Sequence, residues 1–385
     1  MTEYAARALL PEGLHDELPP AAEHEAAVSV RLVQAFAAHG YQRVKPPLIE
    51  FEESLTTGPG GAKGTEMFRL VDPASQRMMA VRSDMTVQVA RIAATRLQKA
   101  PRPLRLSYAG QVLRVKGTQL RPERQFTQAG VELVGVRSVA ADAEVVLLAA
   151  ESIAACGNDR PVTVDLTLPT LVPAIAAFFG LPSAEAAMAR DALDGKDIAA
   201  LDAIEGPAGA LFRGLLQAAG PADRALERLA ALDLPPVARA EVDELAGLVA
   251  AVRAADPKIV LTIDPGEYRA HEYHTGFGFT LFAAGVRGEL GRGGRYDMVG
   301  PDGGTEEAVG FTIYVDSLLR SLAKPAAPAF VYLPFGTALA DARALRADGH
   351  RTVAALAPAT DAEAEAKRLG CSHIFLNGAV RPLAA

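Results

Sequence analysis

The stretch 105–135, RLSYAGQVLRVKGTQLRPERQFTQAGVELVG, decides the fold of this chain. Apolar and polar residues alternate at both ends of the stretch, which predicts strands at Leu104–Leu113 and Gln125–Val134. The middle is too charged and too rich in glycine and proline for a core element, so we expect a long polar loop there. The sequence therefore predicts two strands that pair around a charged loop.

The second strand carries two different faces, because successive side chains of a strand point to opposite sides. Its apolar face, which we expect to pack on a core, consists of Ala129, Val131 and Leu133. Its other face consists of Gln128, Gly130 and Glu132. That polar face either meets water, as is ordinary for an antiparallel strand, or forms the floor of a site. In the second interpretation Gly130 leaves space between a carboxamide and a carboxylate, which suits a small polar ligand with a positive charge.

Composition excludes several classes of protein. The chain has 385 residues, half of them hydrophobic, which is enough for two or three globular domains. The net charge is −7 with no basic block, which argues against a nucleic-acid partner. Two cysteines, Cys156 and Cys371, rule out a disulfide framework and fit a cytoplasmic protein. We expect no secretion signal and no membrane span, since the longest apolar run, Val145–Ala155, is short and contains a glutamate.

The first part of the chain predicts a helix, a strand and a hairpin. Helical spacing of apolar residues predicts a helix at Ala21–His39, and a strand is expected at Tyr41–Pro47. The glycine-rich segment at 58–65 has the wrong residue order for a phosphate-binding loop, so we interpret it as an ordinary loop. A hairpin is expected from Phe68 to Arg82, followed by a helix that begins near Asp84. Asp84 either caps that helix or is shared between the cap and a ligand.

The second half predicts a helical insertion and a small module at the end. Residues 183–256 are Ala-rich and helical in pattern, with no strand signal. The glycine-rich turn 291–299 carries Arg295 and Asp297, which either serve a site or brace the turn. Arg121 and Arg124 in the central loop have the same ambiguity, because a solvated loop face explains them as well. After a linker at 324–328, alternating strand and helix signals predict a small α/β module at 329–385.

Six blocks in a fixed order resemble the catalytic domain of histidyl-tRNA synthetase, a class II synthetase. They are TEMF (65–68), RSDMT (82–86), the strand–loop–strand stretch at 105–135, the segment 269–276, GGRYD (293–297) and AVGFTIYVDSLL (308–319). The resemblance covers most of residues 10–325. It implies an α+β fold in which an antiparallel sheet is flanked by helices over residues 1–323. Residues 183–256 are then the helical insertion, and the small α/β module follows.

The resemblance also implies a histidine-binding pocket that is largely retained. Asp84 takes the position of the acid that meets the α-amino group of histidine. Thr86, Gln128 and Glu132 match the floor of the pocket. Tyr273 matches the first of two aromatic residues near the imidazole, and His274 replaces the second. No metal site and no cofactor are implied.

The adenylation residues of the synthetase family are only partly present. Arg114 and Arg269 match its two catalytic arginines. Lys116 replaces a carboxylate and would repel Mg²⁺. Ser317 replaces the arginine that grips the γ-phosphate, and Tyr314 stands in the place of a glycine. Losing one such donor typically costs about 10²–10³ in rate, so we expect no catalytic residues and no aminoacylation.

A synthetase body with a kept amino-acid pocket, a broken ATP site and a shortened tail is similar to the regulatory subunits of ATP phosphoribosyltransferase. That resemblance implies a non-catalytic subunit, active in histidine biosynthesis and its feedback by L-histidine. The implied partners are a short-form catalytic subunit in a hetero-oligomer, expected as a hetero-octamer, and a second copy of the chain in a homodimer core. The alternatives are an active or atypical histidine–tRNA ligase, and a free-standing paralogue that binds histidine or transfers an adenylate.

Overall fold

The computed structural model describes residues 9–57, 66–117, 121–268, 273–300 and 303–384 of the chain. It divides into two compact units. The first comprises Met1–Glu17 and Glu25–Ala323, and the second comprises Leu18–His24 and Lys324–Ala385. The predicted loop at 58–65 and the candidate residue Arg269 lie outside the described residues.

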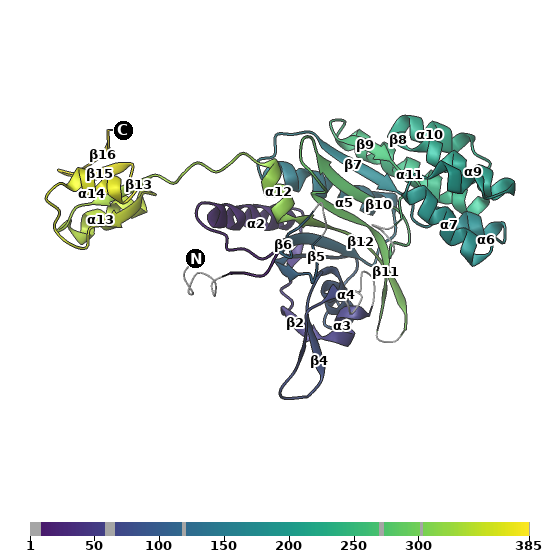
Figure 1. Ribbon diagram of the computed structural model, residues 1–385, viewed down its shortest axis with the longest axis horizontal. Coiled ribbons are helices and arrows are strands. Elements are labelled where there is room, and N and C mark those ends of the chain that lie inside the picture. The colour runs from purple at the N-terminus through teal and green to yellow at the C-terminus, as the bar shows by residue number, and fades with distance from the viewer. Residues whose placement is uncertain (1–8, 58–65, 118–120, 269–272, 301–302, 385) are drawn as a thin grey trace. The chain divides into compact units, whose positions relative to one another are not determined.

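A large sheet forms the centre of the first unit (Figure 1). Within the described residues it has nine strands in the order β1-β5-β6-β12-β11-β10-β7-β9-β8. The strands are β1 (Gln42–Arg43), β5 (Leu104–Leu113), β6 (Gln125–Val134), β7 (Val162–Thr167), β8 (Gly220–Pro221), β9 (Val260–Ile263), β10 (Gly278–Ala283), β11 (Gly291–Val299) and β12 (Thr305–Tyr314). The middle of the sheet is antiparallel, while β1 joins β5 and β7 joins β9 in parallel. The predicted antiparallel sheet flanked by helices is confirmed, with parallel pairs toward both edges.

Helices cover both faces of this sheet. The helices of the body are α2 (Ala21–Ala38), α3 (Glu52–Thr56), α4 (Thr86–Thr95), α5 (Val139–Ala155) and α12 (Val315–Ser321). Residues of α2 and α5 share one core with the apolar face of β6, while Met85 and residues of α4 share another with Tyr108 and Tyr296. Strand β6 is therefore buried on both faces over nearly its whole length. The apolar face packs on a core as predicted, and the interpretation that the polar face meets water is wrong.

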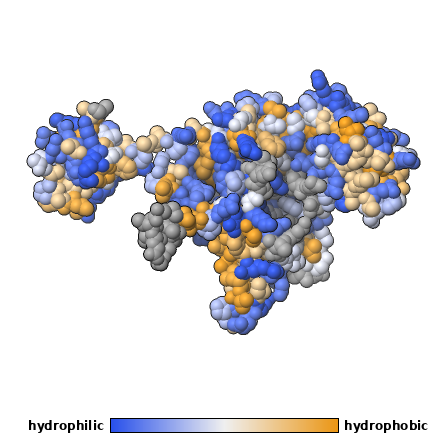
Figure 2. All heavy atoms as spheres, viewed as in Figure 1, coloured by the Kyte–Doolittle hydropathy of each residue, from blue (hydrophilic) through white to orange (hydrophobic). Residues whose placement is uncertain are grey.

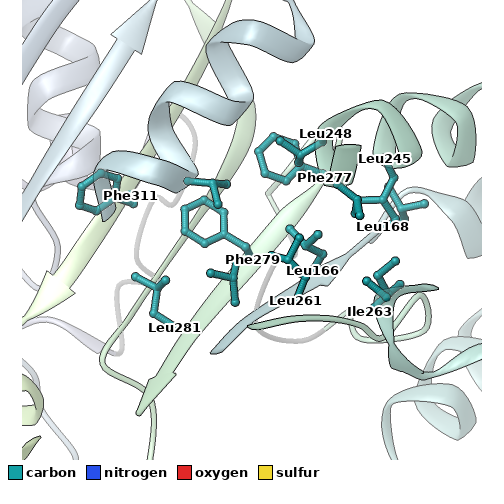
Figure 3. Close-up of a cluster of buried hydrophobic side chains, with 14 of the residues drawn as sticks. Leu166, Leu168, Leu245, Leu248, Leu261, Ile263, Phe277, Phe279, Leu281 and Phe311 are labelled. Atoms are coloured by element: carbon teal, nitrogen blue, oxygen red, sulfur yellow. The ribbon is translucent and has the colours of Figure 1, made fainter. Parts of the chain in front are cut away.

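The helical insertion shares the core of the large sheet (Figure 3). Its helices, with α6 leading into them, are α6 (Leu171–Phe178), α7 (Ser183–Asp194), α8 (Ile198–Asp202), α9 (Gly206–Ala218), α10 (Ala222–Ala231) and α11 (Pro236–Ala255). Leu245 and Leu248 of α11 pack in the same cluster as Leu168 and Phe277 of the body. The expectation of no strand in this region is wrong, because β8 pairs with β9. Strand β8 consists of only two residues, Gly-Pro, which is too short to give a strand pattern in the sequence.

A small antiparallel sheet precedes the central strands. Its order is β2-β4-β3, with β2 (Ile49–Phe51), β3 (Arg69–Val71) and β4 (Met78–Val81). The predicted hairpin is present, but the predicted strand at Tyr41–Pro47 shrinks to β1, because Pro46 and Pro47 have no amide hydrogen to give to a ladder. Figure 2 shows hydrophobic surface around this sheet. Its exposed apolar residues are Leu48, Ile49, Val71 and Met78.

The second unit is a small α/β module. Its elements are β13 (Phe330–Leu333), α13 (Leu339–Ala347), β14 (Arg351–Ala354), α14 (Ala362–Arg368), β15 (His373–Leu376) and β16 (Ala379–Pro382), in the sheet order β14-β13-β15-β16. The first three strands were expected from the sequence, and β16 was not. Asn377 and Gly378 both have positive φ (51° and 76°) in the turn before β16. An Asn-Gly pair is a strong hairpin signal, so β16 was predictable.

None of the helices in the described parts of the chain is both long enough and apolar enough to cross a bilayer.

The close approach of β6 to β12 and to Tyr108 makes Gly130 a sensitive position. A Cβ at Gly130 would lie 2.2 Å from the carbonyl oxygen of Phe311 and 2.6 Å from the Tyr108 hydroxyl. We expect Gly130→Ala to lower the free energy of unfolding by about 1–3 kcal/mol, measured by denaturant titration. The matched control is Gly247→Ala in α11, where the nearest atom is 3.5 Å away, in Val139. That change should be neutral or stabilising by about 0.5–1 kcal/mol, and equal losses in both variants would contradict the packing argument.

Candidate functional site

The candidate site lies on the face of the large sheet that α4 covers. Strand register places Gly110, Gly130 and Gly310 on this face, each opposite a residue of a neighbouring strand. Gly294 of β11 pairs with Gly310 and continues the row. A strand that lacks side chains at such positions lets other groups come close to the backbone. The row of glycines therefore gives this face room for large polar side chains.

Two of these glycines make room for residues of the site itself. The space above Gly130 is filled by the ring and hydroxyl of Tyr108, so Gly130 does not leave space for a ligand between Gln128 and Glu132 as we expected. A Cβ at Gly310 would come within 1.9 Å of Glu132 Oε2. The carboxylate of Glu132 is thus pressed against the backbone of β12, which fixes its position.

Glu132 is a buried carboxyl group held by phenols. Its side chain is 1% exposed. Tyr296 donates a hydrogen bond to Oε2 at 2.7 Å, and Tyr108 donates one to Oε1 at 3.3 Å. Burial, with the charge of Asp84 adding to it, raises the pKa of Glu132 to about 8, while the hydrogen bond from Tyr296 acts in the opposite direction. The folded protein therefore favours the neutral form of this group.

The start of α4 holds the second carboxyl group of the site. Asp84 Oδ1 accepts a hydrogen bond from the Thr86 amide at 2.7 Å, and Oδ2 accepts one from Gln128 Nε2 at 2.8 Å. Gln128 Oε1 in turn accepts from the Met85 amide at 3.0 Å. Both carboxylate oxygens of Asp84 keep further lone pairs. The cap interpretation of Asp84 is wrong in detail, because the N-cap residue of α4 is Met85 and makes no side-chain cap hydrogen bond. Asp84 lies one residue earlier, orders the helix start through the Thr86 amide, and has capacity left for a ligand.

Aromatic rings form the other end of the site. Tyr273 stacks on His274, with ring centroids 4.2 Å apart, and meets Tyr296 edge-on at 6.1 Å. His274 is buried against Gly294, where a Cβ would lie 2.4 Å from its ring. Burial raises the pKa of Tyr273, and the nearby acids Asp84 and Glu132 add to this effect, while the cation of Arg292 acts in the opposite direction. The structure thus brings the predicted residues Asp84, Gln128, Glu132 and Tyr273 into one neighbourhood.

Sequence reasoning missed three members of this neighbourhood. Tyr108 and Thr312 are joined by a 2.6 Å hydrogen bond, and Tyr296 holds Glu132 as described above. Tyr296 lies within the block GGRYD and could have been predicted as a site residue. A strand that begins in this block places Tyr296 on the same face as Gly294. Tyr108 and Thr312 become visible only when the register of β5, β6 and β12 is known.

The side of the sheet matched to nucleotide binding is filled by the protein itself. The guanidinium carbon of Arg121 lies 4.0 Å from the ring centroid of Phe126 and 3.8 Å from that of Tyr314. Arg121 is only 5% exposed and pairs with Asp316 at 2.9 Å. Arg114 lies further out, 5.1 Å from the same Phe126 centroid. We call this arrangement of Phe126, Arg121 and Tyr314 the arginine stack; it contradicts the interpretation of Arg121 as a solvated residue.

The remaining positions of the predicted nucleotide end and of the central loop differ in their surroundings. Ser317 is fully buried and its Oγ accepts a hydrogen bond from Arg320 at 2.8 Å. Lys116 is exposed in the loop after β5. Arg124 donates to the carbonyl oxygen of Glu12 at 2.9 Å.

Arg295 and Asp297 brace the turn, as one interpretation proposed. Arg295 is buried and forms an ion pair with Asp142 of α5. Its backbone carbonyl accepts from the Thr275 amide at 2.9 Å. Asp297 accepts a hydrogen bond from the Thr275 hydroxyl at 3.2 Å. Both residues therefore fix the segment that follows His274.

Comparison with known proteins identifies the type of fold and site. Residues 13–318 match the family model described as histidyl-tRNA synthetase. The structure is similar to histidyl-tRNA synthetase from Nostoc sp. PCC 7120, with a TM-score of 0.79 and 19% identity over 96% of this chain and 91% of that one. It is also similar to a protein from Bacillus halodurans described as "ATP phosphoribosyltransferase regulatory subunit/histidyl-tRNA synthetase", with a TM-score of 0.81 and 23% identity over 94% and 96%. Fold and site together define a protein of the class II histidyl-tRNA synthetase type.

Within that type a nearer group is evident. The ATP phosphoribosyltransferase regulatory subunit of Rhodospirillum centenum is 58% identical over 376 residues, which cover 98% of this chain and 96% of that protein. The chain therefore belongs to the family of ATP phosphoribosyltransferase regulatory subunits, and the resemblance predicted from the sequence is confirmed.

The raised pKa of Glu132 has a consequence for stability. Its pKa is about 8 in the folded protein against an ordinary 4.5. Between these values the unfolded chain ionises this group while the folded protein keeps it neutral. The free energy of unfolding should therefore fall as pH rises from about 5 to 8, by up to about 1.4 kcal/mol per pH unit from this group. Glu132→Gln should remove that slope in denaturant titrations, so that its advantage over wild type grows with pH.

Glu227→Gln, on the exposed side of α10, is the matched control and should leave the slope unchanged. Parallel pH profiles for wild type and Glu132→Gln would show that Glu132 is ionised in the folded protein.

Proposed function

We propose that this chain is the non-catalytic regulatory subunit of ATP phosphoribosyltransferase, that it binds L-histidine, and that it activates a short-form catalytic subunit and carries histidine feedback. The single observation that carries the proposal is a contrast on one face of the sheet. The end with Asp84, Gln128 and Glu132 presents groups for an amino acid. The nucleotide end is closed by the arginine stack.

The charges of the open end suit a free amino acid with a basic ring. Asp84, held by Gln128, offers a carboxylate to an α-ammonium group. Tyr273 and Tyr296 offer flat apolar surfaces beside a carboxyl group, which suits an imidazole. Hydrogen bonds to charged groups contribute about 1.5–3 kcal/mol each. Three or four of them suffice for a micromolar dissociation constant, which corresponds to about −8 kcal/mol.

The closed end supports a role without aminoacylation. A nucleotide base would have to displace Arg121 from between two rings and from its ion pair with Asp316. Ser317 supplies no positive charge where the synthetase family has an arginine, and Lys116 supplies no ligand for Mg²⁺. A protein so built binds the amino acid and does not activate it.

The proposed assembly has a homodimer core inside a hetero-octamer. Exposed Leu48 and Ile49 follow directly after Pro47, and Val71 and Met78 lie in the same small sheet. Apolar residues gathered on one surface are typical of a contact between subunits. Histidine then regulates the complex if it favours one state by about 1–3 kcal/mol.

Activation of the partner is the direct test of the proposal. We expect the purified chain to raise the rate at which a short-form catalytic subunit forms phosphoribosyl-ATP, and added histidine to lower that rate. The measurement is the initial rate with and without the chain. An unchanged rate, with complex formation verified by size-exclusion chromatography, would remove the proposal. Histidine-dependent ATP–pyrophosphate exchange by the chain alone would replace it with the ligase alternative.

Binding of histidine by the open end is tested by calorimetry. We expect Gln128→Ala to weaken histidine binding by about tenfold to a hundredfold, since it removes the group that positions Asp84. Gln217→Ala, exposed in α9, is the matched control and should bind like wild type. Thermal unfolding of both variants checks that the fold survives. Wild-type affinity in a folded Gln128→Ala protein would place the histidine site elsewhere.

A further inference from the structure

We propose that Glu132 is a neutral acid in the empty site and gives its proton to the imidazole of the incoming histidine, so that the pocket selects a ring with a basic nitrogen. This inference rests on the proposed function, because it needs histidine to bind beside Glu132. It adds a chemical step, a proton transfer inside the pocket, that fixes which side chain the site accepts.

The surroundings of Glu132 favour the neutral form when the site is empty. This carboxyl group accepts hydrogen bonds from the phenols of Tyr296 and Tyr108. The partly buried cation on the same face, Arg292, pairs with Glu289. Its side chain is 1% exposed, so water does not compensate the charge. The nearest ionisable acid is Asp84, whose charge opposes a second charge close by. Burial and the charge of Asp84 raise the pKa of Glu132 to about 8, which favours the acid over the carboxylate.

The groups that face Glu132 come from each element packed against it. Strand β5 brings Tyr108, β11 brings Tyr296, the segment before α4 brings Asp84, and the segment before β10 brings Tyr273. Helix α4 also brings the hydroxyl of Thr86, which hydrogen-bonds the carboxyl group, and β12 brings the backbone at Gly310.

The titratable groups that face Glu132 are acids or phenols. Beside them, His274 stacks on Tyr273. The partly buried Arg292 of β11 acts on Tyr273 through its charge and pairs with Glu289. Because Arg292 is held by Glu289, the positive charge beside Glu132 comes with the ligand.

The phenols allow Glu132 to change its charge without losing hydrogen bonds. A hydroxyl group both donates and accepts. Tyr108 contacts Thr312 at 2.6 Å and Thr86 at 3.4 Å besides Glu132, so its proton has other acceptors. The Tyr296 hydroxyl lies 2.7 Å from Oε2 and can donate to this oxygen in either protonation state. Because each protonation state is satisfied, the proton can leave without creating an unpaired buried group.

The imidazole is the natural acceptor of this proton. Asp84 lies at the Gln128 end of the site and meets the ammonium group, so the ring lies at the aromatic end with Glu132, Tyr273 and Tyr296. The O–H bond of Glu132 breaks and an N–H bond forms on the ring nitrogen that lacks a proton. The products are a carboxylate and an imidazolium side by side. The transferred proton stays between Glu132 and the imidazole, and no proton is exchanged with water.

Selectivity follows from the basicity of the ring. A phenylalanine side chain fills the same space but cannot take the proton, so it leaves the buried acid without a partner. A triazole analogue of histidine has nearly the same shape and a much less basic ring. It should therefore bind at least tenfold more weakly than histidine, although it makes the same contacts.

Infrared difference spectroscopy and calorimetry with L-histidine at pH 7 test this proposal together. We expect histidine to abolish the carbonyl stretch of one protonated carboxyl group, and this change to be absent in Glu132→Gln. Calorimetry in two buffers of different ionisation enthalpy should show no net release of protons. The matched control is Glu241→Gln, since Glu241 is another largely buried acid with a raised pKa, held by Thr170. That variant should keep the histidine-induced change.

The outcomes separate this inference from the proposed function. Histidine binding with an unchanged carboxyl band, or with one proton released to the buffer, overturns the proton transfer alone. Absence of any histidine binding overturns the proposed function and the proton transfer with it. Loss of the band in wild type and in Glu241→Gln, with no buffer dependence, supports both.

Discussion

Strand β6 is buried on both faces, and this constraint organises the site. A strand covered only on one side would leave Gln128 and Glu132 to water. Here α4 lies over them, so each polar atom must find a partner inside the protein. Gln128 finds Asp84 and the Met85 amide, and Glu132 finds two phenols. The same requirement that stabilises the fold therefore assembles the polar groups of the candidate site.

The amino-acid end and the nucleotide end of the site lie on the same face of the sheet and differ in their charged groups. At the amino-acid end the buried acid Glu132 is held by phenols, and the partly buried Arg292 on this face pairs with Glu289. At the nucleotide end the cation is already present as Arg121, whose planar guanidinium lies between Phe126 and Tyr314. Stacking on aromatic faces is worth about 2 kcal/mol when the cation is desolvated. An incoming nucleotide base would have to replace the energy of this contact and of the ion pair with Asp316.

The sequence predicted the strands of this centre well and the contacts between them poorly. The bounds of β5 and β6 agree with the prediction, because alternation and a charged loop are local signals. The space above Gly130 was misjudged because its occupant, Tyr108, comes from the neighbouring strand. Arg121 was misjudged for a related reason: a loop that folds back onto its own strands has the composition of a solvated loop. Local pattern identified Asp84, Gln128 and Glu132, while cross-strand register was needed to find Tyr108 and Thr312.

For a regulatory role, binding of the ligand must change the free-energy difference between two states of the protein, and filling the pocket alone does not do this. A ligand shifts an equilibrium between two states only by the difference in its affinity for them. The sheet around the site is closely packed, with glycine backbones in contact with side chains, and gives little by deformation. A change of charge is different. Turning a neutral acid into one half of an ion pair alters interactions by about 1.4 kcal/mol for each unit of pKa shift, which is the size of a typical coupling energy. Strand β11 joins the two faces of the sheet at this point, because Tyr296 contacts Glu132 on one face and the adjacent Arg295 pairs with Asp142 of α5 on the other.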